Sequence, residues 1–536
     1  MRHLFLALLC ALGLSAQDLR LQVLASTDMH GHLGPVDTYS LQPHPKGWAR
    51  LATLIKAQKA KNPNTILVDC GDTLQGEPVN YVRNKLNPEL PEPSIAIMNA
   101  LGYHAMAVGN HEFDFGMAVL RQAEGQARFP FLSANAVRPS DKKPGFGTYT
   151  KVVVRGVNIL LVGFTTPGIP KWMDAALFEG MKFEDIVDSA RILVPKIREK
   201  EKADVVVVLM HSGFGTLPGQ KGDDNAALRL VNEVPGIDLV MTGHTHQPLQ
   251  TAHQGIPILQ PHSHGQALAV GELELRKERG KWRVVGRHGR LETVDLDTVP
   301  DPEILALVAP QQKAADRYLD TFATTLATDL DSRTWRVEDT AVAQLLHTVM
   351  KRETGAQLTA VSVGLQRLYV PRGATSVRQF YGLLPYENQV VRIRISGAQL
   401  RAYLEHAARH LNFSHLPDLY VKEIPSFDYD VLDGCSYVVD LTKPAGQRIT
   451  ALSVGGQPVQ DAQSFTLGMT SYRLYGGGDY LQAMAWKGQP EFVSSQSFRN
   501  LLLAHVLFRP TLSVEVPNRW HTVPYLDRVR VYQQAK

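Results

Sequence analysis

Cysteine is scarce in this sequence. Three cysteines occur in 536 residues, and Cys10 lies in the apolar stretch at the start of the chain. The other two, Cys70 and Cys435, lie in different halves of the chain and lack the close spacing of a metal-binding pair. We therefore expect two isolated thiols, which excludes the disulfide framework of a small secreted domain.

Net charge is also small. It is +4 at pH 7 when the 19 histidines are counted as neutral. So slight an excess on a chain of this length excludes a general scaffold for nucleic acid polymers. The hydrophobic share of 44% and the charged share of 20% are ordinary for globular proteins and exclude a disordered or collagen-like chain. One hydrophobic core rarely supports this length, so we expect roughly two to four domains.

Long apolar runs are missing as well. The run Leu4–Leu14 has a positively charged start before it and small residues after it, a pattern typical of a signal peptide over residues 1–16. It is shorter than the roughly 20 residues that a spanning helix needs, and no later segment reaches that length. We expect a secreted or periplasmic protein without stable membrane insertion, whose mature chain begins near Gln17.

Metal-binding residue types follow short apolar segments at five places in the first half of the chain. Such segments are typical of buried strands, and helical patterns occur between them, which indicates an α/β domain with a site at its strand ends. The segments and the polar residues after them are Leu21–Ala25 with Asp28 and His30, Thr65–Val68 with Asp72, His104–Val108 with Asn110 and His111, Asp204–Met210 with His211, and Gly236–Met241 with His244 and His246.

The spacing of these residues favours shared metal ions. Asp28 and His30 are two apart in an extended segment, so both side chains can approach one ion from the same side. His244 and His246 repeat this spacing after a glycine. The carboxylate of Asp72 could span two cations and offset their mutual repulsion.

The hexapeptide Gly109–Asp114 places a ligand beside a proton donor. The side-chain oxygen of Asn110 can ligate a metal ion, and His111 next to it need not do so. Asp114 could hold one ring nitrogen of His111 and favour the charged imidazolium. Taken alone, the same hexapeptide also fits a turn with a solvated histidine. The later pair His262 and His264 is open in the same way, since it fits either a place beside the metal site or a solvated loop.

Together these segments, over roughly residues 20–275, resemble the metallophosphoesterase signature, and the whole mature chain resembles the two-domain secreted 5'-nucleotidase family. The resemblance implies a four-layer αββα catalytic domain over 17–299, a linker helix over 300–329 and a second α/β, nucleotide-binding domain over 330–536. It also implies a monomer that acts on a small nucleotide substrate.

The resemblance further implies the roles of individual residues. His111 and Asp114 match the catalytic dyad of the family. Two divalent metal ions are expected, drawn from Zn, Mn, Fe, Co or Mg. The residues that match the family's ligands are Asp28, His30, Asp72 and His246 for one ion and Asp72, Asn110, His211 and His244 for the other.

In the second domain, the resemblance points to a nucleobase site. Tyr429 and Tyr472 match the two aromatic positions between which the family stacks the base, and the glycine-rich loop after Tyr472 would let backbone approach a flat ligand. Without the resemblance, both tyrosines would be interpreted as core residues. The loop residues expected to contact substrate are Gly476, Gly477 and Asp479.

The match departs from the 5'-nucleotidases in two runs. Their Asn-Gly-Gly-x-x-Arg phosphate-binding run corresponds to Ser362–Arg367 here, and their Gly-Gly-Asp-Gly loop reads Gly-Gly-Gly-Asp over 476–479. With the run Leu384–Asn388, this looks closer to the 2',3'-cyclic-nucleotide 2'-phosphodiesterase/3'-nucleotidase branch. We therefore expect hydrolysis of cyclic and 3'-nucleotides. The alternatives are a 5'-nucleotidase or nucleotide-sugar hydrolase, a thiosulfate-processing protein, and a non-catalytic secreted binding module.

Overall fold

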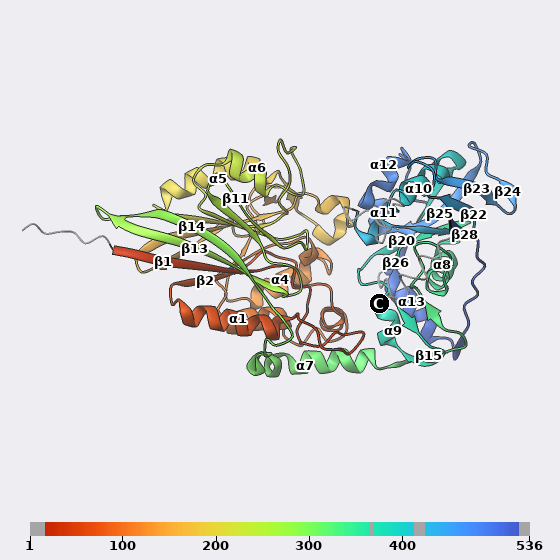
Figure 1. Ribbon diagram of the computed structural model, residues 1–536, viewed down its shortest axis with the longest axis horizontal. Helices are drawn as coiled ribbons and strands as arrows, with labels where there is room; N and C mark the ends of the chain where they lie inside the picture. The colour runs from red at the N-terminus through yellow and green to blue at the C-terminus, as the bar shows by residue number, and fades with distance from the viewer. Residues whose placement is uncertain (1–16, 364–367, 412–423, 525–536) are drawn as a thin grey trace, which may run out of the picture.

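The computed structural model describes residues 17–363, 368–411 and 424–524, which form two lobes (Figure 1). The expected signal peptide over 1–16 and most of the expected phosphate-binding run, 364–367, lie outside the described residues. The first lobe contains two six-stranded sheets, and the second contains a five-stranded sheet with smaller sheets beside it. Within the described part of the chain, no helix is both long and apolar enough to cross a membrane.

The first sheet of the first lobe is mixed. Its inner strands run parallel, and the long hairpin of β13 and β14 adds antiparallel pairing at one edge. In order across the sheet, the strands are β14 (Lys281–Thr293), β13 (Ala267–Glu278), β1 (Gln17–Ser26), β2 (Thr65–Asp69), β3 (Ala105–Ala107) and β4 (Phe131–Leu132).

The second sheet is built in the same way. Its central strands are parallel, and a hairpin lies at each edge. Its strands are, in order, β11 (Leu249–His253), β12 (Ile256–Gln260), β10 (Leu239–Thr242), β9 (Val205–His211), β7 (Val157–Thr165) and β6 (Tyr149–Val154).

Strand β9 shows how the sequence produces the layers. All seven of its residues are buried. Val205 and Val207 pack between the two sheets, whereas Val206 and Val208 pack under helices. A strand covered on both faces needs an apolar residue at every position, which explains the continuous run of valines.

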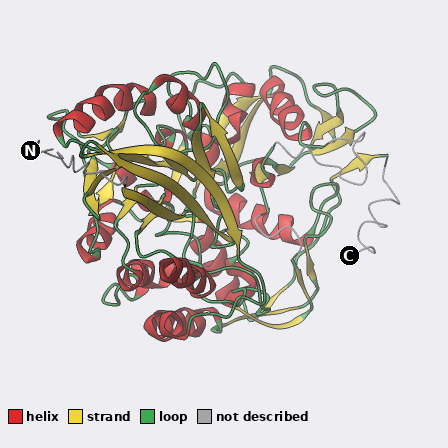
Figure 2. Cartoon of the chain, turned by 60° about the vertical axis from the view of Figure 1, so that its left-hand side comes forward, coloured by secondary structure: helices red, strands yellow, loops and turns green. Residues whose placement is uncertain are grey.

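Helices cover the outer face of each sheet (Figure 2). Buried residues of α1 (Trp48–Lys61) and α3 (Pro93–Leu101) pack on the first sheet, and those of α5 (Ile186–Lys200) and α6 (Ala227–Glu233) pack on the second. The order of layers is therefore helix, sheet, sheet, helix. This confirms the predicted four-layer αββα domain.

The helix that joins the lobes is shorter than predicted. It is α7 (Pro302–Leu319), and the Asp301 side chain caps it by accepting from the N–H groups of Glu303 and Ile304. The predicted span 300–329 is wrong beyond Leu319, because Phe322–Leu326 forms strand β15. This strand pairs with β19 (Gly373–Ser376) and β27 (Thr511–Leu512), and such pairing overrides the helical spacing of its apolar residues.

The second lobe is an α/β domain, as predicted. In this lobe, strand β20 (Gln389–Ser396) leads directly into helix α10 (Gly397–Ala408). Helices α8 (Ala341–Thr354) and α13 (Phe498–Leu507) also pack on its main sheet. The five strands are, in order, β21 (Val431–Asp433), β17 (Leu358–Val361), β25 (Ser464–Thr470), β20 and β26 (Phe492–Ser497).

Hydrogen bonds and ring contacts cross from one lobe to the other. Nε2 of Gln75 donates to the Pro385 carbonyl at 3.0 Å, and the Tyr475 hydroxyl donates to Asp174 Oδ2 at 2.9 Å.

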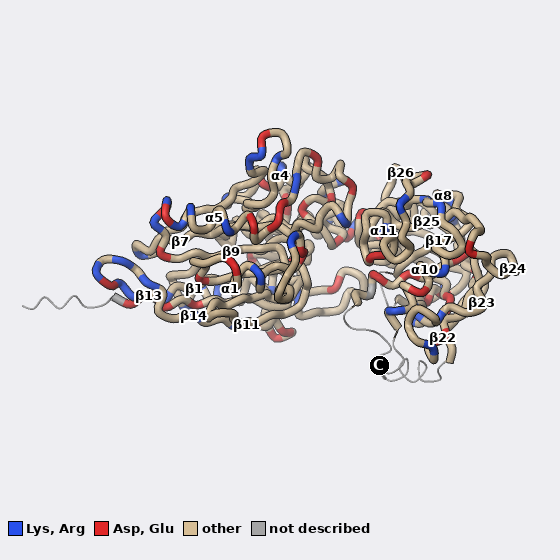
Figure 3. The backbone as a smooth tube through the Cα atoms, turned by 90° about the horizontal axis from the view of Figure 1, so that it is seen from above, with Lys and Arg blue, Asp and Glu red and all other residues tan. Residues whose placement is uncertain are grey.

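Basic and acidic residues are interspersed along both lobes (Figure 3). This distribution agrees with the small net charge of the chain.

Candidate active site

The predicted metal ligands lie together at the carboxyl ends of the parallel strands. Candidate ligand atoms of Asp28, His30, Asp72 and His246 all lie within 4.8 Å of one another. A second group contains Asp72, His211 and His244. Asp72 belongs to both groups, as expected for a carboxylate between two ions.

The backbone at this site adopts an unusual conformation. Five of the candidate ligands are non-glycine residues with positive φ angles, a region that costs on the order of 1 kcal/mol or more per residue and is held only where the surrounding fold fixes it. Such strain collects at functional sites. The residues and angles are Asp28 (50°), His30 (47°), Asp72 (58°), His244 (80°) and His246 (57°).

Lone-pair atoms face one another across the site. Nε2 of His211 lies 3.0 Å from Oδ2 of Asp72, and it is buried without a hydrogen-bond partner in the described part of the chain. Nε2 of His30 lies 3.0 Å from Nε2 of His246. A cation between such atoms would satisfy both members of a pair, so the donor set fits a divalent metal site.

The electrostatics of the site favour a cation. Burial opposes ionisation of Asp72, but the imidazoles of His211 and His111 outweigh it and hold the pKa of Asp72 well below its usual range. Burial likewise disfavours the charged form of His211, yet Asp72 raises the pKa of His211 to about 9. The potential that holds this proton would equally hold a metal ion, and metal binding would displace the proton.

The predicted dyad is adjacent to these ligands. Nδ1 of His111 lies 2.9 Å from Oδ2 of Asp114, and the His111 side chain is 21% exposed. The His111 N–H donates to Oδ1 of Asp72 at 2.8 Å. Burial lowers the pKa of His111, but Asp114 and Asp72 outweigh burial and raise it to about 10. The structure thus places an imidazole that is paired with a carboxylate beside the candidate metal ligands. Oδ1 of Asn110 lies 3.1 Å from Nδ1 of His244, within reach of the same group.

Glu112 has a role that sequence reasoning missed. Its carboxylate is buried and accepts from four backbone N–H groups, at 2.6 to 3.2 Å. It therefore joins the loop after β2 to the loop after β3. Its position between His111 and Asp114 could have drawn attention to it. The spacing of the residues, however, does not show that its carboxylate accepts hydrogen bonds from the backbone. The four donors are the N–H groups of Asp72, Thr73, Leu74 and Gly109.

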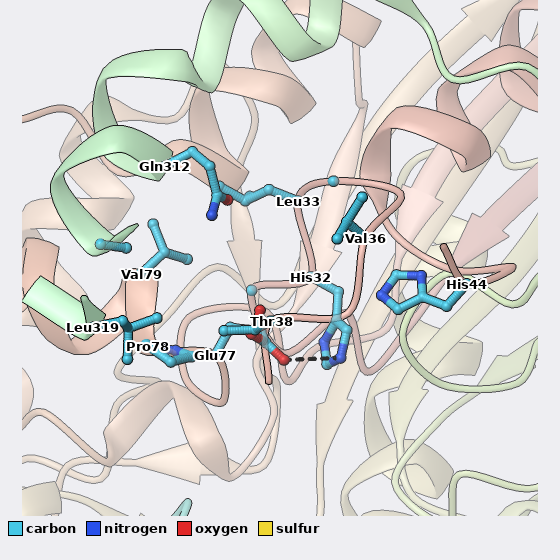
Figure 4. Close-up of a pocket in the computed structure, with 13 residues that line it drawn as sticks. His32, Leu33, Val36, Thr38, His44, Glu77, Pro78, Val79, Gln312 and Leu319 are labelled. Carbon is cyan, nitrogen blue, oxygen red and sulfur yellow. Dashed lines mark hydrogen bonds and ion pairs between the residues drawn. The ribbon is translucent and has the colours of Figure 1, made fainter. Parts of the chain in front are cut away.

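A small cavity of about 20 Å³ lies beside the metal site, next to α7 (Figure 4). Nε2 of His32 lies 3.1 Å from Oε1 of Glu77, and the Thr38 hydroxyl donates to the same carboxylate. The His32 ring stacks on His264, whose ring centroid is 5.6 Å from that of His30. His264 therefore lies beside the ligands. The cavity has room for about one water molecule and is too small for a substrate.

A much larger cleft of about 1330 Å³ opens between the lobes. The metal site and the dyad lie on one wall, and aromatic residues of the second lobe lie on the other. Trp172 also faces the cleft, with its ring centroid 5.2 Å from that of His244. The cleft is large enough for a nucleotide. Among its lining residues are Asp72, His111, Trp172, Tyr386, Phe427 and Tyr472.

Tyr472 lines the cleft, and its neighbours hold its ring. The hydroxyl donates to Asp428 Oδ1 at 3.2 Å, and the Arg473 guanidinium lies 5.1 Å from the ring centroid. A Cβ on Gly477 would lie 2.4 Å from three ring atoms, so glycine is required there. Gly477 therefore packs against the ring. None of the three predicted loop residues, Gly476, Gly477 and Asp479, is among the cleft-lining residues, and Asp479 is exposed.

The position of Tyr429 corrects the sequence prediction. Its side chain is 2% exposed, its hydroxyl donates to the Arg336 carbonyl at 2.8 Å, and its ring stacks on His410. This is the fixed hydroxyl partner expected of a core tyrosine. The chain turns at residues 426–428, so Phe427 instead faces the cleft, 43% exposed, with its ring centroid 6.3 Å from that of Tyr472.

Tyr386 is a second residue that sequence reasoning missed. Its ring comes from the second lobe and stacks against His111, with centroids 5.7 Å apart and an interplanar angle of 20°. The sequence marked Leu384–Asn388 only as a sign of one branch of the family. No pattern within that run shows that its aromatic ring reaches a histidine of the other domain.

Comparison with known proteins agrees with this arrangement. Residues 21–248 match the model of the calcineurin-like phosphoesterase family, and residues 319–485 match that of the 5'-nucleotidase C-terminal domain. The crystal structure of a proposed 5'-nucleotidase from Staphylococcus aureus aligns with a TM-score of 0.82 and 21% identity, covering 94% of this chain and 100% of that one. At this identity the alignment shows the fold.

Two curated relatives extend the match over most of the chain. The trifunctional nucleotide phosphoesterase YfkN of Bacillus subtilis is 28% identical over 95% of this chain, which spans only 39% of that protein. The 2',3'-cyclic-nucleotide 2'-phosphodiesterase/3'-nucleotidase of Haemophilus influenzae is 30% identical over 87% of this chain and 81% of its own length. The chain therefore belongs to the 5'-nucleotidase family of metallophosphoesterases and is a metal-dependent phosphoric ester hydrolase.

Proposed function

We propose that the chain is a two-metal hydrolase that converts 2',3'-cyclic nucleotides and 3'-nucleotides to nucleoside and phosphate. The observation that carries this proposal is the place of Asp72. It belongs to two ligand groups, next to the dyad, in a cleft whose opposite wall holds Phe427 and Tyr472. Phosphate and base can therefore bind at opposite sides of one cleft. The names of the relatives from Haemophilus influenzae and Salmonella typhimurium support the substrate class.

The ligands of the two proposed ions are Asp28, His30, Asp72 and His246 for one and Asp72, Asn110, His211 and His244 for the other. When bound, such ions polarise a phosphoryl oxygen and activate water for attack. The chain's own residues would hold the ester in line with that water and exclude bulk solvent from the cleft.

His111 acts on the substrate in this proposal. The bond from Nδ1 to Asp114 fixes the tautomer and leaves Nε2 as the nitrogen that can donate a proton. A charged imidazole at this place would stabilise negative charge on the phosphoryl oxygens or protonate the departing alkoxide. Asp114 would keep His111 charged and correctly oriented.

The second lobe selects the substrate. Phe427 and Tyr472 are proposed to stack on the base, which tolerates different bases because each has a flat face. We also propose that residues 1–16 direct export, so that the enzyme meets nucleotides outside the cytoplasm.

The test compares release of phosphate from three substrates: 3'-AMP, 2',3'-cyclic AMP and 5'-AMP. The metal-free protein is supplied in turn with Mn, Co, Zn or Mg. The proposal predicts hydrolysis of 3'-AMP and 2',3'-cyclic AMP well above 5'-AMP, and no turnover without metal. Preference for 5'-AMP would instead indicate a 5'-nucleotidase. Metal binding without turnover of any ester would contradict hydrolysis and leave a thiosulfate-processing protein or a binding module.

A further inference from the structure

Tyr386 covers the dyad from the opposite domain. It lies on the loop before β20 in the second lobe, whereas His111 follows β3 in the first lobe. Their ring centroids are 5.7 Å apart with an interplanar angle of 20°, within the range of offset stacking. Both rings line the cleft, so this contact lies at the site of the chemistry and not in the core.

The backbone around Tyr386 is held from both lobes. Nη1 of Arg499 donates to the carbonyls of Leu384 and Pro385, at 3.4 and 3.3 Å, and its guanidinium also pairs with Glu387. From the first lobe, Nε2 of Gln75 donates to the Pro385 carbonyl at 3.0 Å. The loop that carries Tyr386 is therefore fixed on both sides of the cleft.

Gln75 also connects Tyr386 to the metal site. Its backbone carbonyl lies 2.8 Å from Nδ1 of His30, one of the candidate ligands. The same residue thus contacts a ligand imidazole through its backbone and the Tyr386 loop through its side chain. This connection fixes the position of the Tyr386 loop relative to the candidate ligand His30.

We propose that Tyr386 is a positioning residue of the phosphoester reaction and that its ring fixes the imidazole of His111. Because Tyr386 belongs to the second domain, the dyad is complete only when the two lobes are arranged as in this structure. The inference rests on the proposed role of His111. In this proposal the ring of Tyr386, and not its hydroxyl group, positions the His111 imidazole. Misplacement of a catalytic group by about 1 Å costs roughly 100-fold in rate, so loss of this ring should be measurable.

The test uses Tyr386→Ala and Tyr386→Phe, with Tyr369→Phe as control, because Tyr369 is 48% exposed on the same lobe. Turnover is measured on 3'-AMP and on bis(p-nitrophenyl) phosphate, which has no base. Tyr386→Ala should lower kcat about 10- to 100-fold on both substrates, with KM changed less than about 3-fold. Tyr386→Phe and the control should remain close to the parent protein, and melting temperature should hardly change in any variant.

A second measurement is independent of turnover. Diethyl pyrocarbonate acylates accessible imidazoles through their neutral fraction, and peptide mapping at one fixed pH gives its rate at His111. Tyr386→Ala should raise that rate several-fold, whereas Tyr386→Phe should not. An unchanged rate at His111 together with unchanged kcat in Tyr386→Ala would overturn the inference, and so would an equal loss in Tyr386→Phe. Failure of the parent protein to hydrolyse nucleotides would count against the proposed substrate alone, because the mapping and the baseless ester still report on the ring.

Discussion

Individual side chains in the cleft divide by the part of the substrate that we propose they contact. His111 lies among the metal ligands, and its side chain is partly exposed to the cleft. Phe427 and Tyr472 lie on the second lobe, on the wall of the cleft that we propose binds the base. This division allows single substitutions to separate effects on catalysis from effects on recognition.

Replacement of the dyad histidine should leave the metal site intact. We expect His111→Ala to lower turnover by about 100- to 10,000-fold, since it removes a proton donor, without changing metal content. His288→Ala is the control, because that side chain is 64% exposed. Turnover and metal content by plasma mass spectrometry check the prediction. Loss of one metal equivalent would make His111 a ligand instead.

The aromatic residues of the cleft should affect nucleotides only. Phe427→Ala or Tyr472→Ala should raise the dissociation constant of a nucleotide about 5- to 150-fold, because stacking contributes about 1 to 3 kcal/mol per base. Hydrolysis of bis(p-nitrophenyl) phosphate should hardly change. Equal loss on both substrates would show that these rings do not bind the base.

Tyr429 should behave as a core residue. Tyr429→Ala would open a cavity next to Trp335 and His410, so we expect a loss of roughly 3 to 5 kcal/mol in unfolding free energy. Chemical denaturation measures this loss. A normal stability with weaker nucleotide binding would restore Tyr429 to the base site and contradict its position here.

The loops after β2 and β3 depend on one buried carboxylate. Removal of Glu112 leaves four backbone N–H groups without their acceptor, so Glu112→Ala should cost at least about 3 kcal/mol in unfolding free energy. The control is Glu124→Ala, which removes only a surface pair with Arg121 and should cost less than about 1 kcal/mol. Equal costs in the two variants would show that Glu112 does not join the loops.

The elements show what the sequence could and could not predict. The β1 and β9 runs, and the polar residues after them, were predictable because a strand buried on both faces leaves a short continuous apolar run in the sequence. The end of α7 was not, because Phe322–Leu326 keeps a helical spacing while pairing with β19 and β27. Tyr386 was not predictable either, since its partner is some 275 residues away and the contact depends on how the lobes dock.

In the whole molecule, both lobes contribute to one cleft. Contacts such as Tyr81 with Asn500, and Tyr475 with Asp174, join the two walls.

Metal binding should stabilise the folded chain, because the ligand groups come together only when the chain is folded. At a free metal concentration 100 times the dissociation constant, we expect about 2.7 kcal/mol of added stability, measured as a rise in melting temperature. No shift with any divalent metal would contradict a metal site.

The most direct test of the two-metal account is the metal content of Asp72→Asn beside that of Asp69→Asn. Both carboxylates are buried, Asp69 at the end of β2 and Asp72 in the loop after it. Burial raises the pKa of Asp69 to about 8, and only Asp72 belongs to both ligand groups. We predict about two equivalents of metal and full turnover in the parent protein and in Asp69→Asn, with fewer than about one equivalent and almost no turnover in Asp72→Asn. A full metal complement and full activity in Asp72→Asn would contradict the account.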